Sequence, residues 1–256
     1  MLDTGPILDK IRVTSPQRKS KKYPFSISVI KNLQDLVFSK QVTFLVGENG
    51  TGKSTLLEAI ALKAGFGKEG GSKNISFSTT HEKMVTGNIS ELAECMFFSW
   101  RKKVRDGYFF RAESFFNLAN QIDDMVDIPF VSESDVYASY GGQSLHNQSH
   151  GESFMALFKN RIGKGGFYIF DEPEAALSPQ KQLALLRLIH DLCKHKETQF
   201  IIATHSPILL AYPEAEIWSC DSGRLERVSY KDTKHYQITK DFLDNPECYF
   251  SKLFSE

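Results

Sequence analysis

Nowhere does this 256-residue sequence contain the run of about 18 apolar residues that a membrane-spanning helix needs. The first eleven residues also lack the charged and then apolar pattern of a secretory signal peptide. These two absences predict a protein with no transmembrane segment of its own. We therefore expect a soluble, cytoplasmic protein.

An excess of one charge is also missing, because Lys and Arg number 31 and Asp and Glu number 31. Zero net charge gives no overall basic field of the kind that attracts nucleic acid. The basic run 18–22 leaves a local patch open, although such a run is more often a solvated loop. The cysteines are few and widely spaced, which predicts free thiols in a reducing compartment. They are Cys95, Cys193, Cys220 and Cys248.

The composition is otherwise that of an ordinary globular chain, with 41% hydrophobic and 24% charged residues. We find no internal repeat. The length suits a single domain, residues 1–256, into which a mainly helical lobe is inserted at about 80–165.

Apolar periodicity and turn residues predict the elements around the motifs. Strands are expected at 7–13, 25–30, 42–46, 166–170 and 199–203. Helices are expected after the glycine-rich turn that ends at 52, around 89–100, 113–122 and 152–162, from 179 to 194, and near 236–254. The polar stretch 132–149 is expected to be a loop, and 221–223 the turn of a hairpin.

Residues 47–54, Gly-Glu-Asn-Gly-Thr-Gly-Lys-Ser, match the phosphate-binding pattern G-x-x-x-x-G-K-[ST]. Glycines allow the backbone to curl so that its N–H groups surround phosphate oxygens, at the positive end of the following helix. Lys53 is expected to reach the β- and γ-phosphates, and Ser54 to bind Mg²⁺. The residues predicted to hold ATP here are Asn49, Gly50, Thr51, Gly52, Lys53, Ser54 and Thr55.

The apolar strand 166–170 ends in two carboxylates, Asp171 and Glu172. Asp171 is predicted to hold Mg²⁺ together with Ser54. Glu172 is predicted to orient and polarise the attacking water, as a catalytic residue. A glutamate in this place favours hydrolysis over phosphoryl transfer to a second substrate.

Three further segments complete a pattern that resembles the ABC ATPases. Residues 171–178, Asp-Glu-Pro-Glu-Ala-Ala-Leu-Ser, resemble the Walker B and D-loop of that family. Residues 148–153 resemble its signature, and 203–206, Ala-Thr-His-Ser, its switch-histidine loop. The whole chain is similar to the AAA-family "predicted ATPase" group, which is related to ABC and chromosome-maintenance or DNA-repair ATPases.

The resemblance implies an α/β fold with a P-loop NTPase core sheet of the RecA-like or ABC kind. A small N-terminal β-subdomain and the helical lobe would complete it. Two copies would face each other head to tail, so that the signature of one covers the ATP of the other. Ser149, Gly151 and Glu152 would then contact the γ-phosphate in trans, while His205 would contact it in cis with a catalytic role.

Some positions depart from the family pattern or stay open. His150 replaces a signature glycine, and Ser178 replaces the D-loop aspartate. The Q-loop residue is left between Glu113, Ser114 and Gln121. The adenine-stacking aromatic is left between Tyr23 and Phe25, and Arg12 is a weaker candidate for a nucleotide contact, since it is more simply a surface residue.

The sequence thus predicts a Mg²⁺-dependent ATPase that dimerises with ATP, and whose role involves a DNA or protein partner. The alternative is the ATP-binding subunit of an ABC transporter. A P-loop kinase does not explain Glu172 or His205, and an inert nucleotide-gated module does not explain a complete catalytic set.

Overall fold

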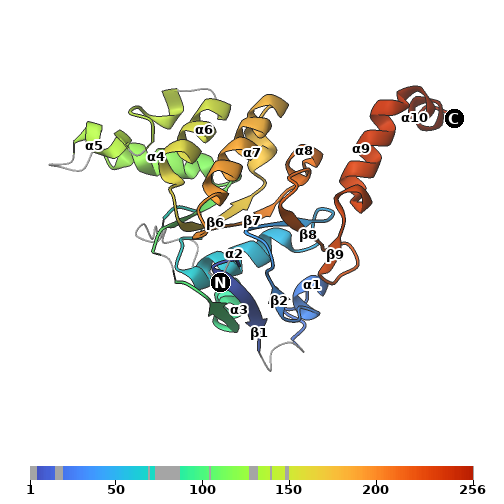
Figure 1. The fold of residues 1–256 in the computed structure, drawn as a ribbon, viewed down its shortest axis with the longest axis horizontal. Helices are drawn as coiled ribbons and strands as arrows, with labels where there is room; N and C mark the ends of the chain where they lie inside the picture. The colour runs from blue at the N-terminus through green and yellow to red at the C-terminus, as the bar shows by residue number, and fades with distance from the viewer. Residues whose placement is uncertain are drawn as a thin grey trace.

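A computed structural model of the protein describes residues 5–14, 20–68, 70–72, 87–103, 105–126, 132–138, 140–147 and 150–255. A six-stranded sheet crosses the middle of the molecule in the order β5-β6-β7-β3-β8-β9 (Figure 1). Its strands are β5 (Gly107–Arg111), β6 (Gly166–Asp171), β7 (Thr198–Ala203), β3 (Val42–Val46), β8 (Ala215–Ser219) and β9 (Glu226–Val228).

Neighbouring strands of this sheet run parallel except β8 and β9, which form an antiparallel hairpin. Every residue of β3, β6 and β7 is buried, because helices or the second sheet cover both faces. This explains why these strands are almost continuous apolar runs in the sequence. The predicted α/β fold with a mostly parallel core sheet is confirmed.

A second, antiparallel sheet has the order β2-β1-β4. Its strands are β1 (Leu8–Val13), β2 (Leu36–Val37) and β4 (Met96–Trp100). The predicted helix at 89–100 is therefore wrong in its second half: α3 (Gly87–Glu94) ends and the chain turns into β4. Pairing with β1, which lies far away in the sequence, decides this strand.

The predicted strand at 25–30 is also wrong, since this segment is a turn followed by the short helix α1 (Ser28–Lys31). Phe25, Val29 and Ile30 are nevertheless buried, so the apolar run was correctly assigned to the core. A short apolar run does not distinguish a strand from a buried helical turn by periodicity alone.

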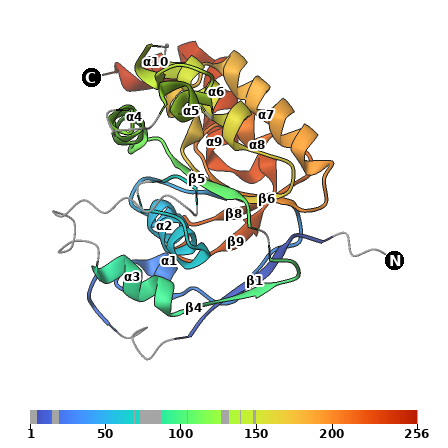
Figure 2. The same cartoon turned by 90° about the vertical axis from the view of Figure 1, so that its left-hand side faces the viewer.

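Helices cover both faces of the central sheet, as Figures 1 and 2 show. On one face α2 (Lys53–Ala64) and α3 lie between the central sheet and the small sheet. The other face carries α4 (Phe115–Asp124), α5 (Glu133–Ala138), α6 (His150–Arg161), α7 (Pro179–Cys193) and α8 (Pro207–Leu210). Each face has its own hydrophobic core.

The helices expected near 113–122, 152–162 and 179–194 are confirmed as α4, α6 and α7. Part of the expected loop 132–149 is instead helical, in α5 and a 3-10 turn at Leu145–Asn147. Between 87 and 161, β4 and β5 belong to the two sheets and α4 to α6 form the helical part. The extent of an inserted lobe stays a proposal.

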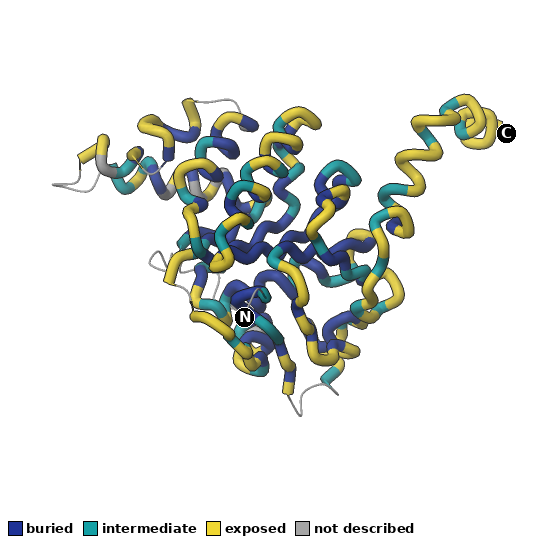
Figure 3. The backbone as a smooth tube through the Cα atoms, in the orientation of Figure 1, coloured by how far each residue is buried: buried dark blue, intermediate teal, exposed yellow. Residues whose placement is uncertain are grey.

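The chain ends with α9 (Lys234–Asp244) and α10 (Pro246–Leu253), which confirm the expected terminal helices. They extend away from the body as an arm, and Figure 3 shows them mostly exposed. The start of α9 lies next to α8. In the described part of the chain, no helix has the length and apolar character required to cross a bilayer.

Candidate functional site

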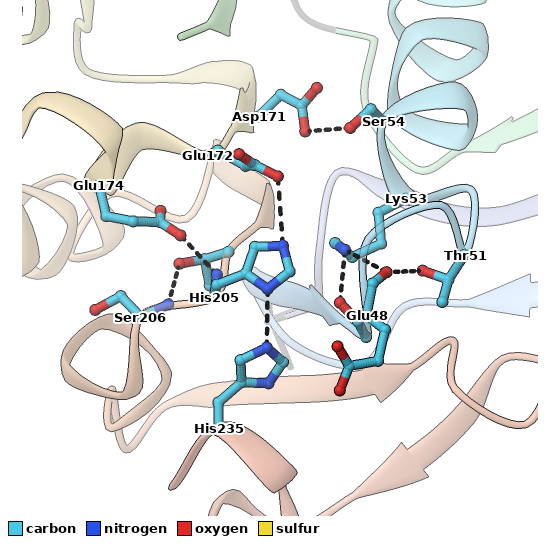
Figure 4. Close-up of polar contacts among 12 residues, drawn as sticks. Glu48, Thr51, Lys53, Ser54, Asp171, Glu172, Glu174, His205, Ser206 and His235 are labelled. Carbon is cyan, nitrogen blue, oxygen red and sulfur yellow. Dashed lines mark hydrogen bonds and ion pairs between the residues drawn. The ribbon is translucent and has the colours of Figure 1, made fainter. Parts of the chain in front are cut away.

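The glycine-rich turn lies between the carboxyl end of β3 and the first turn of α2 (Figure 4). Gly50 and Gly52 have φ angles of 79° and 100°, a left-handed conformation that favours glycine. A Cβ on Gly52 would also lie 2.7 Å from Cγ2 of Ile27. The backbone curl therefore requires the glycine that the motif places there.

Lys53 is only 4% exposed, and its ammonium lies inside the loop. Its Nζ donates hydrogen bonds to the carbonyl oxygens of Gly47 at 2.6 Å and Glu48 at 3.1 Å. A buried ammonium that has only backbone acceptors is well suited to bind an anion, since a phosphate supplies the missing counter-charge.

A hollow of about 360 Å³ opens beside this lysine. It is lined by Tyr23, Ile27, Asn49, Gly50, Gly52, Lys53, Ser54, Thr55 and Glu172. The amino terminus of α2 faces it, and the positive end of a helix dipole favours negative charge. The structure thus brings the residues of the turn that are predicted to bind nucleotide to one cavity, except Thr51, which does not line it.

The predicted metal ligands meet across the strand and the helix. Ser54 Oγ donates a hydrogen bond to Oδ1 of Asp171 at 3.1 Å (Figure 4). Burial raises the pKa of Asp171 to about 6, against the opposing effects of the Arg111 charge and the Ser54 hydrogen bond. A hydroxyl and a carboxylate in contact form an oxygen donor pair of the kind that Mg²⁺ prefers alongside phosphate oxygens.

Glu172 follows in an unusual backbone conformation, with φ of 52°. Its N–H donates to the carbonyl oxygen of Ala203 on β7, at 3.0 Å. A left-handed conformation at a non-glycine residue is strained and is held by its surroundings. It directs the carboxylate into the hollow, where Oε1 lies 3.4 Å from Nε2 of His205.

His205 lies just beyond β7, where Glu174 and His235 contact it. The backbone N–H of His205 donates to Oε1 of Glu174 at 2.6 Å, and its ring Nδ1 lies 2.9 Å from Nε2 of His235. The next residue, Ser206, caps α8. Burial raises the pKa of Glu174, and the hydrogen bond from His205 opposes that rise. The loop that carries the histidine is thus built into the protein interior.

Lys53, Asp171, Glu172 and His205 come from three separate stretches of sequence. They meet because β3, β6 and β7 are parallel neighbours, whose carboxyl ends reach the same edge of the sheet. This edge offers an anion site, an oxygen pair for a cation, and a carboxylate beside an imidazole.

The comparisons with known proteins agree with this arrangement. Residues 88–210, which include the acidic pair and His205 but begin after the glycine-rich turn, match the family model described as AAA ATPase domain. In the solved structures, one chain of a metal-chelate type ABC transporter in an inward-facing conformation is similar, with a TM-score of 0.51 at 15% identity. The match covers 91% of this chain and 88% of that chain.

The chain has the P-loop fold of the ABC ATPases.

Two curated relatives match shorter parts of their own lengths. Translation initiation factor RLI1 of Saccharomyces cerevisiae is 24% identical over 189 residues, which are 72% of this chain and 28% of RLI1. Protein ea59 of Escherichia phage lambda is 40% identical over 58 residues, 22% of this chain and 11% of ea59. The chain therefore spans less than a third of either relative.

Only two of the three signature residues predicted from the sequence can be placed. Ser149 lies outside the described residues. Gly151 is buried and Glu152 exposed in the first turn of α6, and neither lines the hollow at Lys53 of the same chain. Their role therefore stays a prediction, and it requires a second copy.

The candidates left open by the sequence separate in the structure. Phe25 is 3% exposed and belongs to the core, whereas Tyr23 lines the hollow with its hydroxyl 3.3 Å from Oγ1 of Thr55. Arg12 pairs with Asp35 at 3.2 Å, an ordinary surface contact. Of the two aromatic candidates, Tyr23 is therefore the one that lines the hollow.

Arg111 is a site residue that the sequence analysis missed. It ends β5 in register with Asp171, and its Nε lies 3.8 Å from Oδ2 of that carboxylate. It also pairs with Glu58 at 3.1 Å and with the Q-loop candidate Glu113 at 3.2 Å. The sequence feature that could have identified Arg111 is its position as a charged residue at the end of the apolar run Gly-Tyr-Phe-Phe.

Of the other Q-loop candidates, Ser114 is buried and the side chain of Gln121 lies outside the described part.

Proposed function

We propose that this protein binds ATP with Mg²⁺ in the hollow beside Lys53 and hydrolyses it. One observation carries the proposal. The Lys53 ammonium, the Ser54–Asp171 pair and the Glu172–His205 pair all lie at the same edge of the central sheet. A nucleoside triphosphate with its Mg²⁺ is a ligand that needs a cation for its phosphates, oxygen ligands for its metal and a base for the attacking water.

Each residue has a role in this reaction. Lys53 and the N–H groups of residues 49–55 hold the phosphates, and Tyr23 packs on the base. Ser54 and Asp171 hold Mg²⁺, which when bound neutralises phosphate charge and orients the γ-phosphate. Glu172 orients a water molecule and accepts its proton as the oxygen attacks phosphorus. The bond from the γ-phosphorus to the bridging oxygen breaks, and ADP leaves with the electron pair.

His205 completes the cis half of the site. An Nε2–H group directed past Glu172 would donate to a γ-phosphate oxygen and so detect its departure. The trans half would come from Ser149, Gly151 and Glu152 of a second copy, in a head-to-tail dimer that forms with ATP. Support for the dimer is the exposure of Glu152 in the first turn of α6, together with the fact that neither Gly151 nor Glu152 lines the hollow of its own chain.

The work driven by this cycle is proposed to be remodelling of nucleic acid or protein. The alternative, an ATP-binding subunit of an ABC transporter, is favoured by the fold likeness to a transporter chain. A transporter subunit would need a membrane-embedded partner.

Steady-state ATP hydrolysis by the wild type, Lys53→Ala and Glu172→Gln tests the proposal. We expect Mg²⁺-dependent turnover by the wild type and no nucleotide binding by Lys53→Ala. Glu172→Gln should retain ATP affinity but turn over about 100-fold or more slowly, because general base catalysis contributes that much. Tight ATP binding by Lys53→Ala, or normal turnover by Glu172→Gln, would contradict the assigned roles.

The same assay with duplex DNA at several protein concentrations separates the two candidate roles. A rate per protomer that rises with DNA and with concentration supports a dimerising ATPase that acts on nucleic acid. A rate that DNA does not change directs the search to protein or membrane partners.

A further inference from the structure

His205 has a neighbour that the ATPase reaction does not account for. His235, on the C-terminal helix α9, lies with its Nε2 2.9 Å from Nδ1 of His205, and the two rings meet edge to face (Figure 4). Both residues are half-buried. The contact joins the arm of the molecule to the switch histidine of the ATP site.

The surroundings of the pair decide where the protons are. Nε2 of His205 is buried, makes no hydrogen bond within the described residues and faces the Glu172 carboxylate at 3.4 Å. A lone pair in that place would be repelled by the carboxylate, whereas an N–H would be attracted. Nε2 of His205 therefore carries a proton, and in the tautomer that has this single proton Nδ1 is an acceptor.

An acceptor at Nδ1 of His205 requires a donor, and Nε2–H of His235 is the group in reach. Nδ1 of His235 makes no hydrogen bond within the described chain, so no contact there opposes this tautomer. Burial and then the neighbouring His205 lower the pKa of His235, while Asp221 and Glu48 raise it and Lys53 lowers it. A neutral imidazole with a single N–H is consistent with these effects.

The helix that brings His235 to the site is fixed at its first turn. Thr233, which is 3% exposed, caps α9 by accepting a hydrogen bond from the N–H of Tyr236 at 3.3 Å. Tyr230, which precedes α9, donates from its hydroxyl to the carbonyl oxygen of Pro207 at 3.0 Å. Because Pro207 begins α8, directly after the His205 loop, the two histidines are held on connected segments.

A second link runs from α9 to the phosphate-binding turn. Lys234 Nζ lies 3.9 Å from Oδ2 of Asp221, whose Oδ1 accepts a hydrogen bond from the N–H of Glu48 at 2.9 Å. Adjacent residues of α9 thus contact both the His205 loop and, through Asp221, the P-loop.

We infer that His235 is a positioning residue of the ATP site, which donates its Nε2–H to His205 and so directs the Nε2–H of His205 toward Glu172 and the γ-phosphate. The inference rests on the proposed ATPase function. Since the opposite tautomer would present a lone pair to the phosphate, loss of the donor weakens catalysis without removing any nucleotide contact. The arm therefore supplies part of the catalytic geometry, and displacing α9 from the body slows hydrolysis.

The test compares His235→Gln, His235→Leu and the control His190→Gln in the full chain. Glutamine retains an N–H donor near the position of Nε2, whereas leucine fills the space without one. His190 is an exposed histidine on α7, outside the ATP site. For His235→Leu we expect kcat to fall about tenfold or more with the ATP dissociation constant changed by less than about threefold, as for a group needed only in the transition state. His235→Gln should recover most of the rate, and His190→Gln should match the wild type.

Nitrogen NMR of histidine-labelled wild type gives a readout independent of turnover. We expect the ring signals of His205, identified with His205→Asn, to show a protonated Nε2 and an unprotonated Nδ1, and His235→Leu to change that pattern. A wild-type His205 protonated only at Nδ1, or equal rates for His235→Leu and the wild type, would overturn the inference. So would a His235→Gln variant as slow as His235→Leu, since that result assigns His235 a purely structural role. If the wild type does not hydrolyse ATP, the proposed function fails, and the NMR pattern still decides the tautomer.

Discussion

At the scale of one residue, burial decides the protonation of Asp171. It is 4% exposed, and the Arg111 guanidinium lies 3.8 Å away. Burial dominates, and its pKa rises from 3.8 to about 6. Because the folded state then holds the proton more tightly than the unfolded state, the free energy of unfolding falls as pH rises from about 4 to 6.

Asp171→Asn is therefore expected to stabilise the nucleotide-free protein at pH 7. The gain is at most about 3 kcal/mol, since each unit of pKa shift corresponds to about 1.4 kcal/mol. ATP with Mg²⁺ should stabilise the folded wild type more than ATP alone does. The variant should lose this difference, because it lacks the Asp171 carboxylate that would bind the metal. Urea denaturation at pH 5 and pH 7, with and without nucleotide, measures both effects, and the gain should vanish near pH 4.

Asp191→Asn is a suitable control for that experiment. Hydrogen bonds from Lys194 and Arg187 lower the pKa of this exposed carboxyl to about 2, opposite to the shift at Asp171. Its replacement should not stabilise the protein at pH 7. A loss of stability for Asp171→Asn would mean that the ion pairs around Arg111 outweigh the burial of the carboxylate.

At the scale of an element, the four-residue helix α8 fixes the loop that carries His205. Ser206 caps it by accepting hydrogen bonds from the N–H groups of Ile208 and Leu209, and its hydroxyl donates to Oε1 of Gln182 at 2.5 Å. Gln182 in turn donates to the carbonyl oxygen of Leu177 at 2.9 Å. This buried network ties the His205 loop to α7 and to the segment after the acidic pair.

Ser206→Ala should destabilise the protein by about 1–3 kcal/mol, because it removes a helix cap and leaves a buried amide oxygen without its donor. The loosened loop should also lower kcat more than it raises KM for ATP. Ser178→Ala provides the matched comparison, since Ser178 is an exposed cap of α7 whose Oγ accepts from the N–H of Lys181 at 3.4 Å. Thermal unfolding of both variants checks the ranking, and equal losses would show that the Gln182 contact adds nothing.

At the scale of the whole molecule, the proposed dimer depends on two separate surfaces. The hollow at Lys53 lies at the sheet edge, whereas Glu152 is an exposed residue in the first turn of α6. A head-to-tail pair of chains would join the two surfaces around each nucleotide.

Glu172→Gln with Mg²⁺ and ATP is therefore expected to run at twice the monomer mass in light scattering, and to return to monomer when ATP is removed. Adding Glu152→Arg should reduce the dimer while ATP binding persists, because it places a large cation at the predicted trans contact. Lys159→Glu, an equally exposed charge change at the far end of α6, should leave the dimer intact. If the variant with Glu152→Arg still dimerises fully, the start of α6 is not part of the dimer interface.

The sequence by itself determined the parts of this protein that are local in the chain. The P-loop, the acidic pair and the His205 loop are each contiguous, and their strands are apolar runs that imply burial on both faces. The alternation of these strands with helices predicted the α/β sheet, and the order of motifs predicted the resemblance. The pattern of residues 47–54 predicted the phosphate turn, and the structure gives Gly50 and Gly52 the left-handed φ angles that favour glycine.

Tertiary structure alone decided the contacts between distant segments. It made 96–100 a strand by pairing it with β1, and it placed Phe25 in the core and Tyr23 at the hollow. It also set Arg111 beside Asp171 and His235 against His205, which lies 30 residues earlier. Such neighbours depend on the order of strands in a sheet and on where a helix docks, and neither is encoded in the pattern of one segment.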